Sequence, residues 1–553
     1  MSKELNATYY WDHFQYVLRY VQKHYAPILS VEETLFTEHY QVLSMPAQCL
    51  FLRLCSRNPT WFRVDKLSYA EIPNIVIACN SLEQAGFLEY LHVDSVESLE
   101  TIFSIFTRKE CGELALSIDP EYRIPSALSK VEAIDFLTER LADKKLIQAL
   151  IDRFGSLVRP RQTDMLEFIQ FLFFGSTARD MTDFVVRDLG HRQFIEVADD
   201  ELIPFFNDRL EVIQKWKISR WRQELRDLPK EDSADVLALR WESDIWSMVD
   251  ELTDKTAGAF ERSLFELARR FERETNIEKA LALYERSLMP NALERRIRIL
   301  HKIGRKTEAM DWARVGLEIT LNPQELHFFE DYLAKQDSNS SIKRVTKSLK
   351  AAEKVAIPIE FQGKVEQGVI EHYKGLGYEA YFTENQLWKN LIGLIAWDLI
   401  FDLNKQSFHH PFQYAPSAFH TEEFSLESWP AFQDRLSILD DFSSCMDYLR
   451  RVSSAQHGIL NPYVDWFSLD LYLMESFLKR VPTESLKNIC LHFWKNPSTH
   501  AKGFPDLFVF RDQEYAFVEV KSPNDHLSAI QHDWHQYFKE QSVEIKLLRV
   551  VWK

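Results

Sequence analysis

The segment GFPDLFVFRDQEYAFVEVKS at residues 503–522 constrains the fold more than any other part of the sequence. It contains two short apolar runs on either side of a polar turn, a pattern that predicts an antiparallel β-hairpin. Whether the loop has two or four residues, Phe510 lies opposite Tyr515, and Asp506 therefore lies opposite Glu519. Directly opposed residues share one face of a sheet, with Cβ atoms about 5 Å apart. The hairpin thus predicts a close pair of carboxylates.

Lys521 follows Glu519 by two positions and joins the same face. Two neighbouring carboxylates should repel each other, whereas a divalent cation between them would be stabilising. Oxygen ligands suit Mg²⁺ or Mn²⁺, and a lysine beside them suits phosphodiester hydrolysis, because it can orient water and offset transition-state charge. The alternative is an exposed hairpin with a salt-bridged face; Pro505 before Asp506 favours the catalytic interpretation. The opposite face is expected to enter a core through Leu507, Val509, Val518 and Val520.

The spacing of these residues carries a family resemblance. A Pro-Asp pair, twelve residues and then Glu-Val-Lys resembles the PD-(D/E)xK nuclease signature, whose core is α-β-β-β-α-β. The continuation SPNDHLSAIQHDWHQYF resembles the VRR-NUC branch of those nucleases. With TENQLWKNLIGLIAWDLIF, NPYVDWFSLDLYL and KLSYAEIP elsewhere, the chain resembles the Fanconi-anaemia-associated nuclease family over nearly its whole length, as a shorter, bacterial-type member.

The resemblance implies a site with one or two Mg²⁺ or Mn²⁺ ions. It places a further acidic ligand on the helix before the strands, and the matching position is Glu384. The implied catalytic residues are Glu384, Asp506, Glu519 and Lys521, and the implied metal ligands are the three carboxylates with the carbonyl of Val520. Lys521 would position the attacking water.

Other polar residues near this segment are weaker candidates. Glu366 and Glu371 are lesser acidic candidates on the preceding helix. His526, His532 and His535 could suggest a second metal site, but scattered surface histidines are the favoured interpretation. No nucleotide cofactor is expected, because KGLG at 374–377 lacks the spacing of a phosphate-binding loop.

The length of 553 residues predicts several domains. The expected fold is multidomain and mainly α, with a helical DNA-binding part, a tetratricopeptide-like helical array and an α/β PD-(D/E)xK nuclease domain. Residues 141–260 are expected to be helical. The expected divisions are a winged-helix-like domain at 1–95, a SAP-like DNA-binding domain at 96–160, the helical array at 161–355 and the VRR-NUC nuclease domain at 356–553.

The helical array is predicted from a weak internal similarity. EKALALYERSL at 278–288 recurs as TEAMDWARVGL at 307–317, which aligns Ala280 with Ala309. Small residues at matching positions indicate close helix packing in a solenoid-like array. Upstream, IQKWKISRWRQELR is interpreted as a salt-laced helix with inward-packed tryptophans rather than a phosphate-tracking surface.

Two regions of the N-terminal part are candidates for DNA contact. A basic cluster beside Trp61 and Phe62 could touch phosphates and bases; the alternative, equally favoured, is a solvated helix edge with a packed tryptophan. Ser129 is a plausible N-cap of a helix whose first residue could meet a phosphate. The predicted DNA-binding residues are Arg53, Arg57, Arg63, Lys66 and Lys130.

The formal net charge of −17 argues mildly against a polyanionic partner, so a nuclease requires local basic surfaces. The six cysteines are widely spaced, which argues against a zinc module or a disulfide framework. The ubiquitin-binding zinc finger of animal members therefore has no counterpart. The N-terminus lacks a signal-peptide layout, so we expect a cytoplasmic protein, nucleoid-associated if bacterial.

These features lead to one functional hypothesis and two alternatives. The leading hypothesis is a metal-dependent, structure-selective DNA nuclease; by resemblance, it is a 5′-flap endonuclease and 5′-to-3′ exonuclease of the phosphodiesterase I type. Its expected partner is branched or flapped double-stranded DNA, and its expected role is repair of interstrand crosslinks. The alternatives are a Holliday-junction resolvase and a non-catalytic tetratricopeptide-like scaffold with a decayed nuclease domain.

Overall fold

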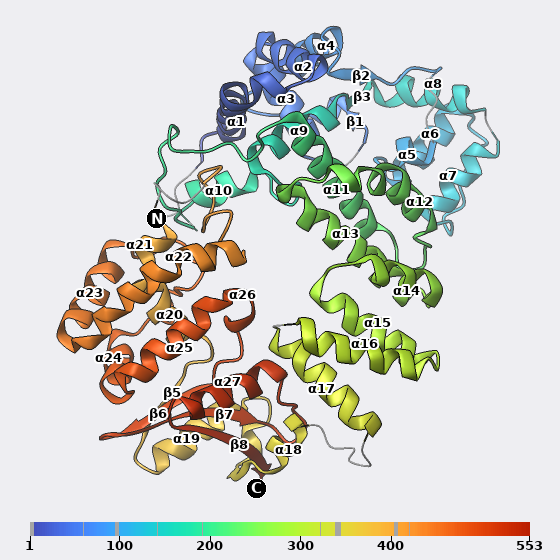
Figure 1. Ribbon diagram of the computed structural model, residues 1–553. Helices are drawn as coiled ribbons and strands as arrows, with labels where there is room; N and C mark the ends of the chain where they lie inside the picture. Colours follow the sequence, from blue (N-terminus) through green and yellow to red (C-terminus); the bar gives the residue numbers. More distant parts are fainter. Residues whose placement is uncertain are drawn as a thin grey trace. The chain divides into compact units, whose positions relative to one another are not determined.

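A computed structural model describes residues 5–553 apart from 59, 95–98, 141, 191, 321, 338–343, 403–407 and 420. The chain forms two compact units. The first comprises residues 1–191 and 204–216, and the second comprises residues 192–203 and 217–553. Figure 1 traces their helices and strands along the sequence.

The first unit is built from helices around a small antiparallel sheet of order β1-β3-β2. Phe62 of β1 pairs with Val158 of β3, and Leu88 of β2 pairs with Pro160. The elements are α1 (Tyr9–Tyr25), α2 (Val31–Val42), α3 (Met45–Cys55), β1 (Phe62–Arg63), α4 (Ile75–Gln84), β2 (Leu88–Tyr90), α5 (Leu99–Phe103), α6 (Arg108–Ile118), α7 (Lys130–Thr138), α8 (Asp143–Phe154), β3 (Leu157–Pro160), α9 (Thr163–Phe174) and α10 (Thr182–Asp188).

The pairing of β3 corrects one expectation. Leu157–Pro160 was expected to be helical but forms a strand, and it pairs with β1 and β2 of the segment 1–95 rather than with its sequence neighbours. In the sequence, helices α5 to α8 therefore separate β2 from β3, although these two strands are neighbours in the sheet. Partners so distant in sequence leave no local signal in a four-residue strand.

Trp61 follows the second of the two interpretations, a packed tryptophan. Its side chain is completely buried in a core that includes Ile102, Leu114 and Leu150 of the helices α5 to α8. Phe62 is buried as well. Neither ring can therefore stack on a base, whereas the predicted N-cap Ser129 is confirmed by a capping box with Glu132.

The second unit begins with a helical array, which confirms the predicted solenoid-like part. Ala280 of α14 and Ala309 of α16 are both completely buried, as the internal similarity required. Gly316 of α16 approaches Phe329 so closely that a Cβ atom would lie 2.5 Å from the ring. The helices are α11 (Arg209–Asp227), which crosses from the first unit, α12 (Asp235–Asp244), α13 (Asp254–Arg273), α14 (Ile277–Arg286), α15 (Pro290–Lys302), α16 (Lys306–Ile319), α17 (Pro323–Asp337) and α18 (Arg344–Lys350).

The tryptophans of α11 pack inward, as interpreted from the sequence. Trp221 is buried and donates from Nε1 to the carbonyl of Leu237 at 2.8 Å. Trp216 packs its ring against Phe168 and Phe171. This helix therefore uses its aromatic residues for structure.

A five-stranded mixed sheet of order β4-β8-β7-β6-β5 forms the C-terminal part. Strands β5, β6 and β7 are antiparallel neighbours, while β8 runs parallel to both β7 and β4. The succession α19, β5, β6, β7, α27, β8 matches the expected α-β-β-β-α-β core. Its elements are β4 (Glu353–Ile357), α19 (Val365–Gly375), β5 (Glu379–Phe382), β6 (Leu507–Arg511), β7 (Glu514–Lys521), α27 (Ala529–Glu540) and β8 (Ile545–Trp552).

A long helical insertion separates β5 from its neighbour β6. It comprises α20 (Gln386–Ile395), α21 (Trp397–Ile400), α22 (Glu422–Arg435), α23 (Phe442–Ala455), α24 (Leu471–Arg480), α25 (Thr483–Lys495) and α26 (Pro497–His500). Trp388 of α20 packs against Phe517 of the sheet and Phe538 of α27. The insertion thus helps to cover the sheet face that carries aromatic residues.

The two faces of the sheet have different cores. Leu507, Val509, Val518 and Val520 pack with residues of α19, as expected. The aromatic face is covered by α20 and α27, and Figure 1 shows α19 and α27 on opposite sides of the sheet. The fold class is therefore confirmed: mainly helical, with a C-terminal α/β domain.

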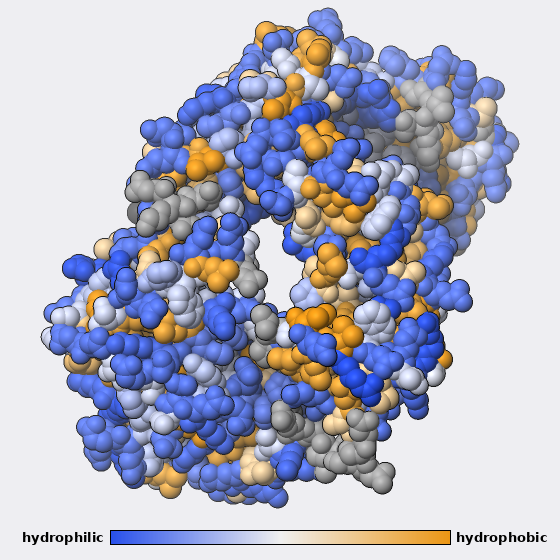
Figure 2. Space-filling model, viewed as in Figure 1, coloured by the Kyte–Doolittle hydropathy of each residue, from blue (hydrophilic) through white to orange (hydrophobic). Residues whose placement is uncertain are grey.

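Hydrophilic residues dominate the face of the molecule that Figure 2 shows. Within the described part of the chain, no helix is both long enough and apolar enough to cross a membrane.

Candidate active site

The register of β6 and β7 sets the carboxylate pair. Phe510 pairs with Tyr515 and Leu507 with Val518, so the next opposed pair is Asp506 and Glu519, as predicted. A two-residue turn closes the hairpin, and Asp512 in it takes a left-handed φ of +52°. Asp506, Glu519 and Lys521 lie on the aromatic face, where β6 begins and β7 ends.

Asp506 is held by backbone groups of two neighbouring segments. Its Oδ2 accepts a hydrogen bond of 2.7 Å from the amide of Val520, and its carbonyl accepts one of 2.7 Å from the amide of Thr383. The side chain is buried, which raises the pKa of Asp506 to about 7. The Val520 amide and Lys521 oppose this rise, whereas Glu384 and Glu366 add to it.

Glu519 is more deeply buried, at 2% exposure. Burial, and after it the charge of Asp506, raises the pKa of Glu519 to about 8. Lys521 Nζ lies 2.8 Å from Glu519 Oε1 and is itself buried. One buried ammonium therefore faces two buried carboxyl groups, which leaves the cluster short of positive charge.

Glu384 is near this pair but not on the element expected for it. It was expected on a helix preceding the strands, whereas it lies in the turn between β5 and α20. The pKa values of Asp506 and Glu519 both rise under its charge, so it belongs to the same electrostatic cluster. The correction follows from the position of the insertion, which starts directly after β5 instead of preceding the sheet.

Asn385 fixes the turn that carries Glu384. Its φ of +59° is left-handed, a conformation that asparagine tolerates better than most residues. Its Oδ1 accepts a hydrogen bond of 3.2 Å from the amide of Phe504, two residues before Asp506. Sequence reasoning missed this residue, and Asn after Glu384 in a strand-to-helix turn was the available signal.

Gly503 lets the segment before Asp506 approach α27 closely. At its φ of +83°, a Cβ atom would lie 2.3 Å from Ile530 Cγ2 and 3.2 Å from the Gln531 amide nitrogen. Glycine is thus required by both conformation and space. The segment 503–505 before Asp506 therefore contacts the Glu384 turn through Phe504 and α27 through Gly503.

Of the two lesser acidic candidates on α19, one contributes to the site. Glu366 acts on the pKa of Asp506 through its charge. Glu371 instead pairs with Lys374 at 3.0 Å on the same helix. The helix before the strands therefore does present an acidic residue to the site, at Glu366.

The residues present fit a divalent cation. Two adjoining carboxyl groups with raised pKa values and a third carboxylate form a donor set of oxygen atoms, and the one lysine beside them does not balance their charge. The amide of Val520 points to Asp506, and the amide and carbonyl of one strand residue share an edge. The carbonyl of Val520 is thus directed to the same edge.

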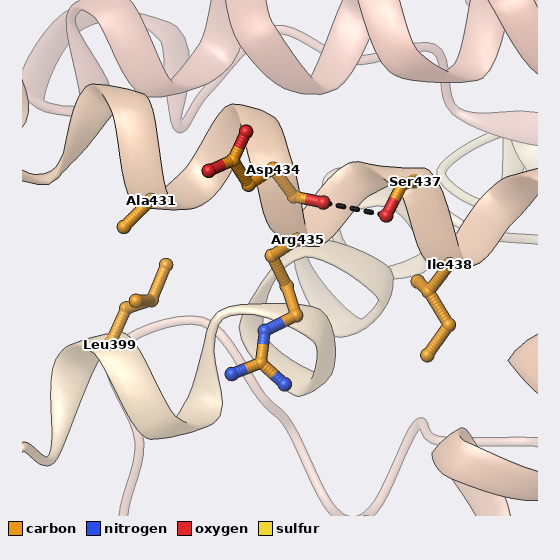
Figure 3. A pocket seen from close by; sticks show the side chains of 6 residues that line it. All are labelled: Leu399, Ala431, Asp434, Arg435, Ser437 and Ile438. Carbon is orange, nitrogen blue, oxygen red and sulfur yellow. Dashed lines mark hydrogen bonds between the residues drawn. The ribbon is translucent and has the colours of Figure 1, made fainter.

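A cavity of about 390 Å³ adjoins this cluster. It lies between the turn that carries Glu384 and the loop before α24. Asp465 and Asp470 of that loop, together with Asn390 of α20, add polar groups to its wall. A depression of about 550 Å³ elsewhere in the insertion lacks such chemistry: its lining residues Asp434 and Arg435 point in different directions (Figure 3).

The three histidines after β7 do not group as a second metal site, and they are not all at the surface either. His532 and His535 are buried, which corrects the expectation of surface positions. A different group, His492, His500 and Asp533, brings its possible ligand atoms within 4.8 Å of one another. Its two imidazole rings stack at 4.2 Å between centroids with an angle of 19° between their planes, so their in-plane lone pairs lie in two nearly parallel planes.

Several of the predicted DNA-binding residues have partners within the first unit. Arg53 pairs with Glu71 at 2.8 Å, and Arg63 pairs with Glu110 at 2.5 Å. Lys130 Nζ donates to the carbonyl of Ser104 at 2.7 Å. Arg57 lies over the ring of Tyr69. Lys66 is exposed, and DNA contact by all five stays a prediction.

Comparisons with known proteins agree with this arrangement. The family model "FAN1, HTH domain" matches residues 8–89, and the model "VRR-NUC domain" matches residues 446–552. The chain is 26% identical to the Fanconi-associated nuclease 1 homolog of Pseudomonas aeruginosa, over 98% of this chain and 96% of that protein. It is 24% identical to the Arabidopsis thaliana homolog, over 98% of this chain but 67% of the plant protein.

Solved structures share the fold over the whole chain. A crystal structure of paFAN1 bound to 2nt 5′ flap DNA with a gap has a TM-score of 0.84 at 24% identity and covers 100% of this chain and 99% of that one. A second, with 1nt 5′ flap DNA, has a TM-score of 0.81. The chain is therefore similar to Fanconi-associated nucleases over nearly its whole length, shares the fold of paFAN1, and matches the VRR-NUC domain model at residues 446–552.

Proposed function

We propose that this protein is a structure-selective DNA nuclease that cleaves phosphodiester bonds with the help of Mg²⁺ or Mn²⁺. The observation that carries the proposal is the buried pair Asp506 and Glu519, which shares the single ammonium group of Lys521. A scaffold with a decayed nuclease domain would have no reason to keep two carboxyl groups buried at an energetic cost.

Each residue of the cluster has a role in this reaction. Asp506, Glu519 and Glu384 would hold the metal, with the carbonyl of Val520 as a backbone ligand. When bound, the metal supplies charge stabilisation and lowers the pKa of water. Lys521, 2.8 Å from Glu519, is placed to orient the attacking water and to offset charge that develops on the phosphate.

The substrate class follows from the relatives. The solved structures that share the fold hold 5′ flap DNA, so we propose that 5′-flapped or gapped duplexes are cut here too, with 5′-to-3′ exonuclease activity of the phosphodiesterase I type. The helical first unit would grip the duplex through phosphate contacts, which position DNA without reading sequence. Repair of interstrand crosslinks is the proposed role.

Cleavage of labelled 5′-flap DNA with Mn²⁺ tests the proposal. We expect the parent protein to cut near the flap junction, and Asp506→Ala to lose at least about 100-fold in activity because a metal ligand is gone. Glu371→Gln is the matched control, since Glu371 pairs with Lys374 outside the site. Equal cleavage by Asp506→Ala and the parent would refute the site, and an inactive parent would refute the function.

A further inference from the structure

Exposed phenylalanines lie at or near the cavity of about 390 Å³ that Glu384 lines. Among the residues that the structure describes, three phenylalanines are exposed: Phe467, which is fully exposed, Phe382 at 56% and Phe442 at 37%. Phe382 lines the cavity beside Glu384, and Phe467 lies between Asp465 and Ser468, which line the same cavity from the loop before α24. Phe382 therefore lines the cavity, and Phe467 extends from the loop whose residues Asp465 and Ser468 line it.

The loop that presents Phe467 is firmly held. Asn390 Oδ1 accepts a hydrogen bond of 2.8 Å from the Asp465 amide, and Asp465 Oδ1 accepts one of 3.1 Å from the Phe467 amide. Trp466 turns inward, where its Nε1 donates to the carbonyl of Ile459 at 2.7 Å. The neighbouring aromatic residue is thus packed, while the ring of Phe467 is left in water by a well-bonded backbone.

Phe382 is fixed just as closely to the catalytic cluster. It pairs with Leu507 at the end of β5, directly before Thr383, whose amide binds the Asp506 carbonyl. Phe382 is therefore tied by backbone hydrogen bonds to the segment that carries Asp506, whereas the loop of Phe467 is tied to α20 through the side chain of Asn390.

The charge of the cavity wall selects the kind of ligand that these rings can hold. Glu384, Asp465 and Asp470 make the wall acidic, which disfavours direct contact with a phosphate. A nucleobase is uncharged and stacks on an aromatic face irrespective of sequence. A base within a duplex has both of its faces covered by its neighbours, so the ring requires an unpaired one.

We propose that Phe467, with Phe382 across the cavity, forms a stacking site for an unpaired nucleobase next to the scissile phosphate. The inference rests on the proposed nuclease function and deepens it, because it assigns selection of unpaired nucleotides to the catalytic domain itself. Phe467 acts as a positioning residue: it holds the strand, whereas the carboxylates and Lys521 act on the phosphate.

Binding measured in EDTA tests the stacking site separately from cleavage. The probe is a fluorescent 5′-flap duplex, compared with the same duplex in which the unpaired nucleotides are abasic. We expect Phe467→Ala to weaken binding of the flap duplex about 5- to 100-fold, the range for loss of one base–aromatic stack. Phe467→Trp should bind as the parent does, and Phe467→Leu should resemble alanine, since leucine is apolar but has no π face.

Phe442→Ala is the matched control, because Phe442 is an exposed phenylalanine of the same domain whose chain neighbours, unlike those of Phe467, do not line the cavity. The abasic probe should bind the parent as weakly as the normal probe binds Phe467→Ala. Phe467→Ala should bind the abasic probe no more weakly than the parent does. In cleavage with Mn²⁺, Phe467→Ala should raise KM more than it lowers kcat.

Two results would overturn the stacking site. One is equal binding of the flap duplex by Phe467→Ala, Phe442→Ala and the parent. The other is equal weakening of a fully paired duplex by Phe467→Ala, which would make the surface a site for duplex DNA or protein. A parent that binds flap DNA through Phe467 but does not cleave it would instead refute the nuclease function alone.

Discussion

In the first unit, arginines beside β1 have carboxylate partners, whereas in the C-terminal domain two buried carboxyl groups share one lysine. Arg63 contacts both Glu110 and Asp65, so its charge is matched within the folded chain. At the active site, burial instead raises the pKa of Asp506 to about 7 and that of Glu519 to about 8.

The difference separates charges that stabilise the fold from charges reserved for a ligand. A matched ion pair at the surface contributes little and needs nothing from outside. An unmatched buried cluster is a liability until a cation binds it. Charge balance, rather than the number of charged residues, thus distinguishes the two regions.

The largest expected effect comes from removing the one cation of the unmatched cluster. Lys521→Met should lower kcat for 5′-flap cleavage by about 10²- to 10³-fold, the range for loss of one electrostatic contact to a transition state. KM should change much less, because the metal ligands remain. Arg153→Met, which removes the exposed ion pair with Glu113 in the first unit, is the control, and it should leave kcat within a few-fold of the parent. Equal kcat values for Lys521→Met and the parent would remove the lysine from the mechanism.

The backbone around the carboxylate cluster should tolerate replacement of a glycine by alanine less well than the backbone near β1. Gly503→Ala combines left-handed strain with a clash against Ile530 and should destabilise the protein by about 2–5 kcal/mol, measured by urea unfolding. Gly155→Ala in the first unit has a similar φ of +80° but open space around its Cβ position, so it should cost about 1–2 kcal/mol. Equal losses would show that the close approach of Gly503 to α27 is unimportant.

The raised pKa values predict a steep pH dependence of metal binding. A cation must displace protons from Asp506 and Glu519 below about pH 7 and 8, so Mn²⁺ affinity should rise about tenfold or more per pH unit from pH 6 to 7 and level off above pH 8. Calorimetry in buffers of different ionisation enthalpy would count the protons released. A Kd that does not change with pH would contradict the raised values.

Without metal, the same shifts act on stability with a defined sign. Both folded-state pKa values lie above those of the unfolded chain, so their contribution is present at low pH and is lost as pH rises through about 7 and 8. In EDTA, Asp506→Asn should therefore lose less stability than the parent between pH 5.5 and 8.5.

The smallest effect is expected at the first unit. Lys66 is exposed, and Lys66→Gln should reduce the slope of log affinity against log salt by about 0.9 if it binds one phosphate. Arg63→Gln should alter the slope less, because Arg63 already has carboxylate partners. A larger change for Arg63 would mean that it exchanges those partners for phosphates when DNA binds.

The hairpin could be predicted from sequence because its information is local. Alternation and turn position alone fix Phe510 opposite Tyr515, and the pair Asp506 and Glu519 follows. The place of Glu384 could not be predicted from the residues themselves, because residues 386–500 intervene before β6. The family resemblance found the residue, but attached it to the wrong element.

The remaining differences also involve partners far apart in the chain. Arg53 finds Glu71, and Arg63 finds Glu110, through the tertiary fold, so a basic cluster in the sequence does not reveal which of its members are already paired. The exposure of Phe467 was equally invisible, because Trp466 beside it has the same apolar character and is turned inward.

The strand order has a consequence for synthesis of the protein. Strand β8 lies between β4 and β7, although it follows both in the chain. Strand β6 pairs with β5 but is separated from it by the helical insertion. Such non-local pairing is slow to form, and a nascent chain emerges from its N-terminus. The sheet that supports Asp506 and Glu519 thus lacks an inner strand until residues 545–552 leave the ribosome. The active site is therefore completed only after nearly all of this chain has been synthesised.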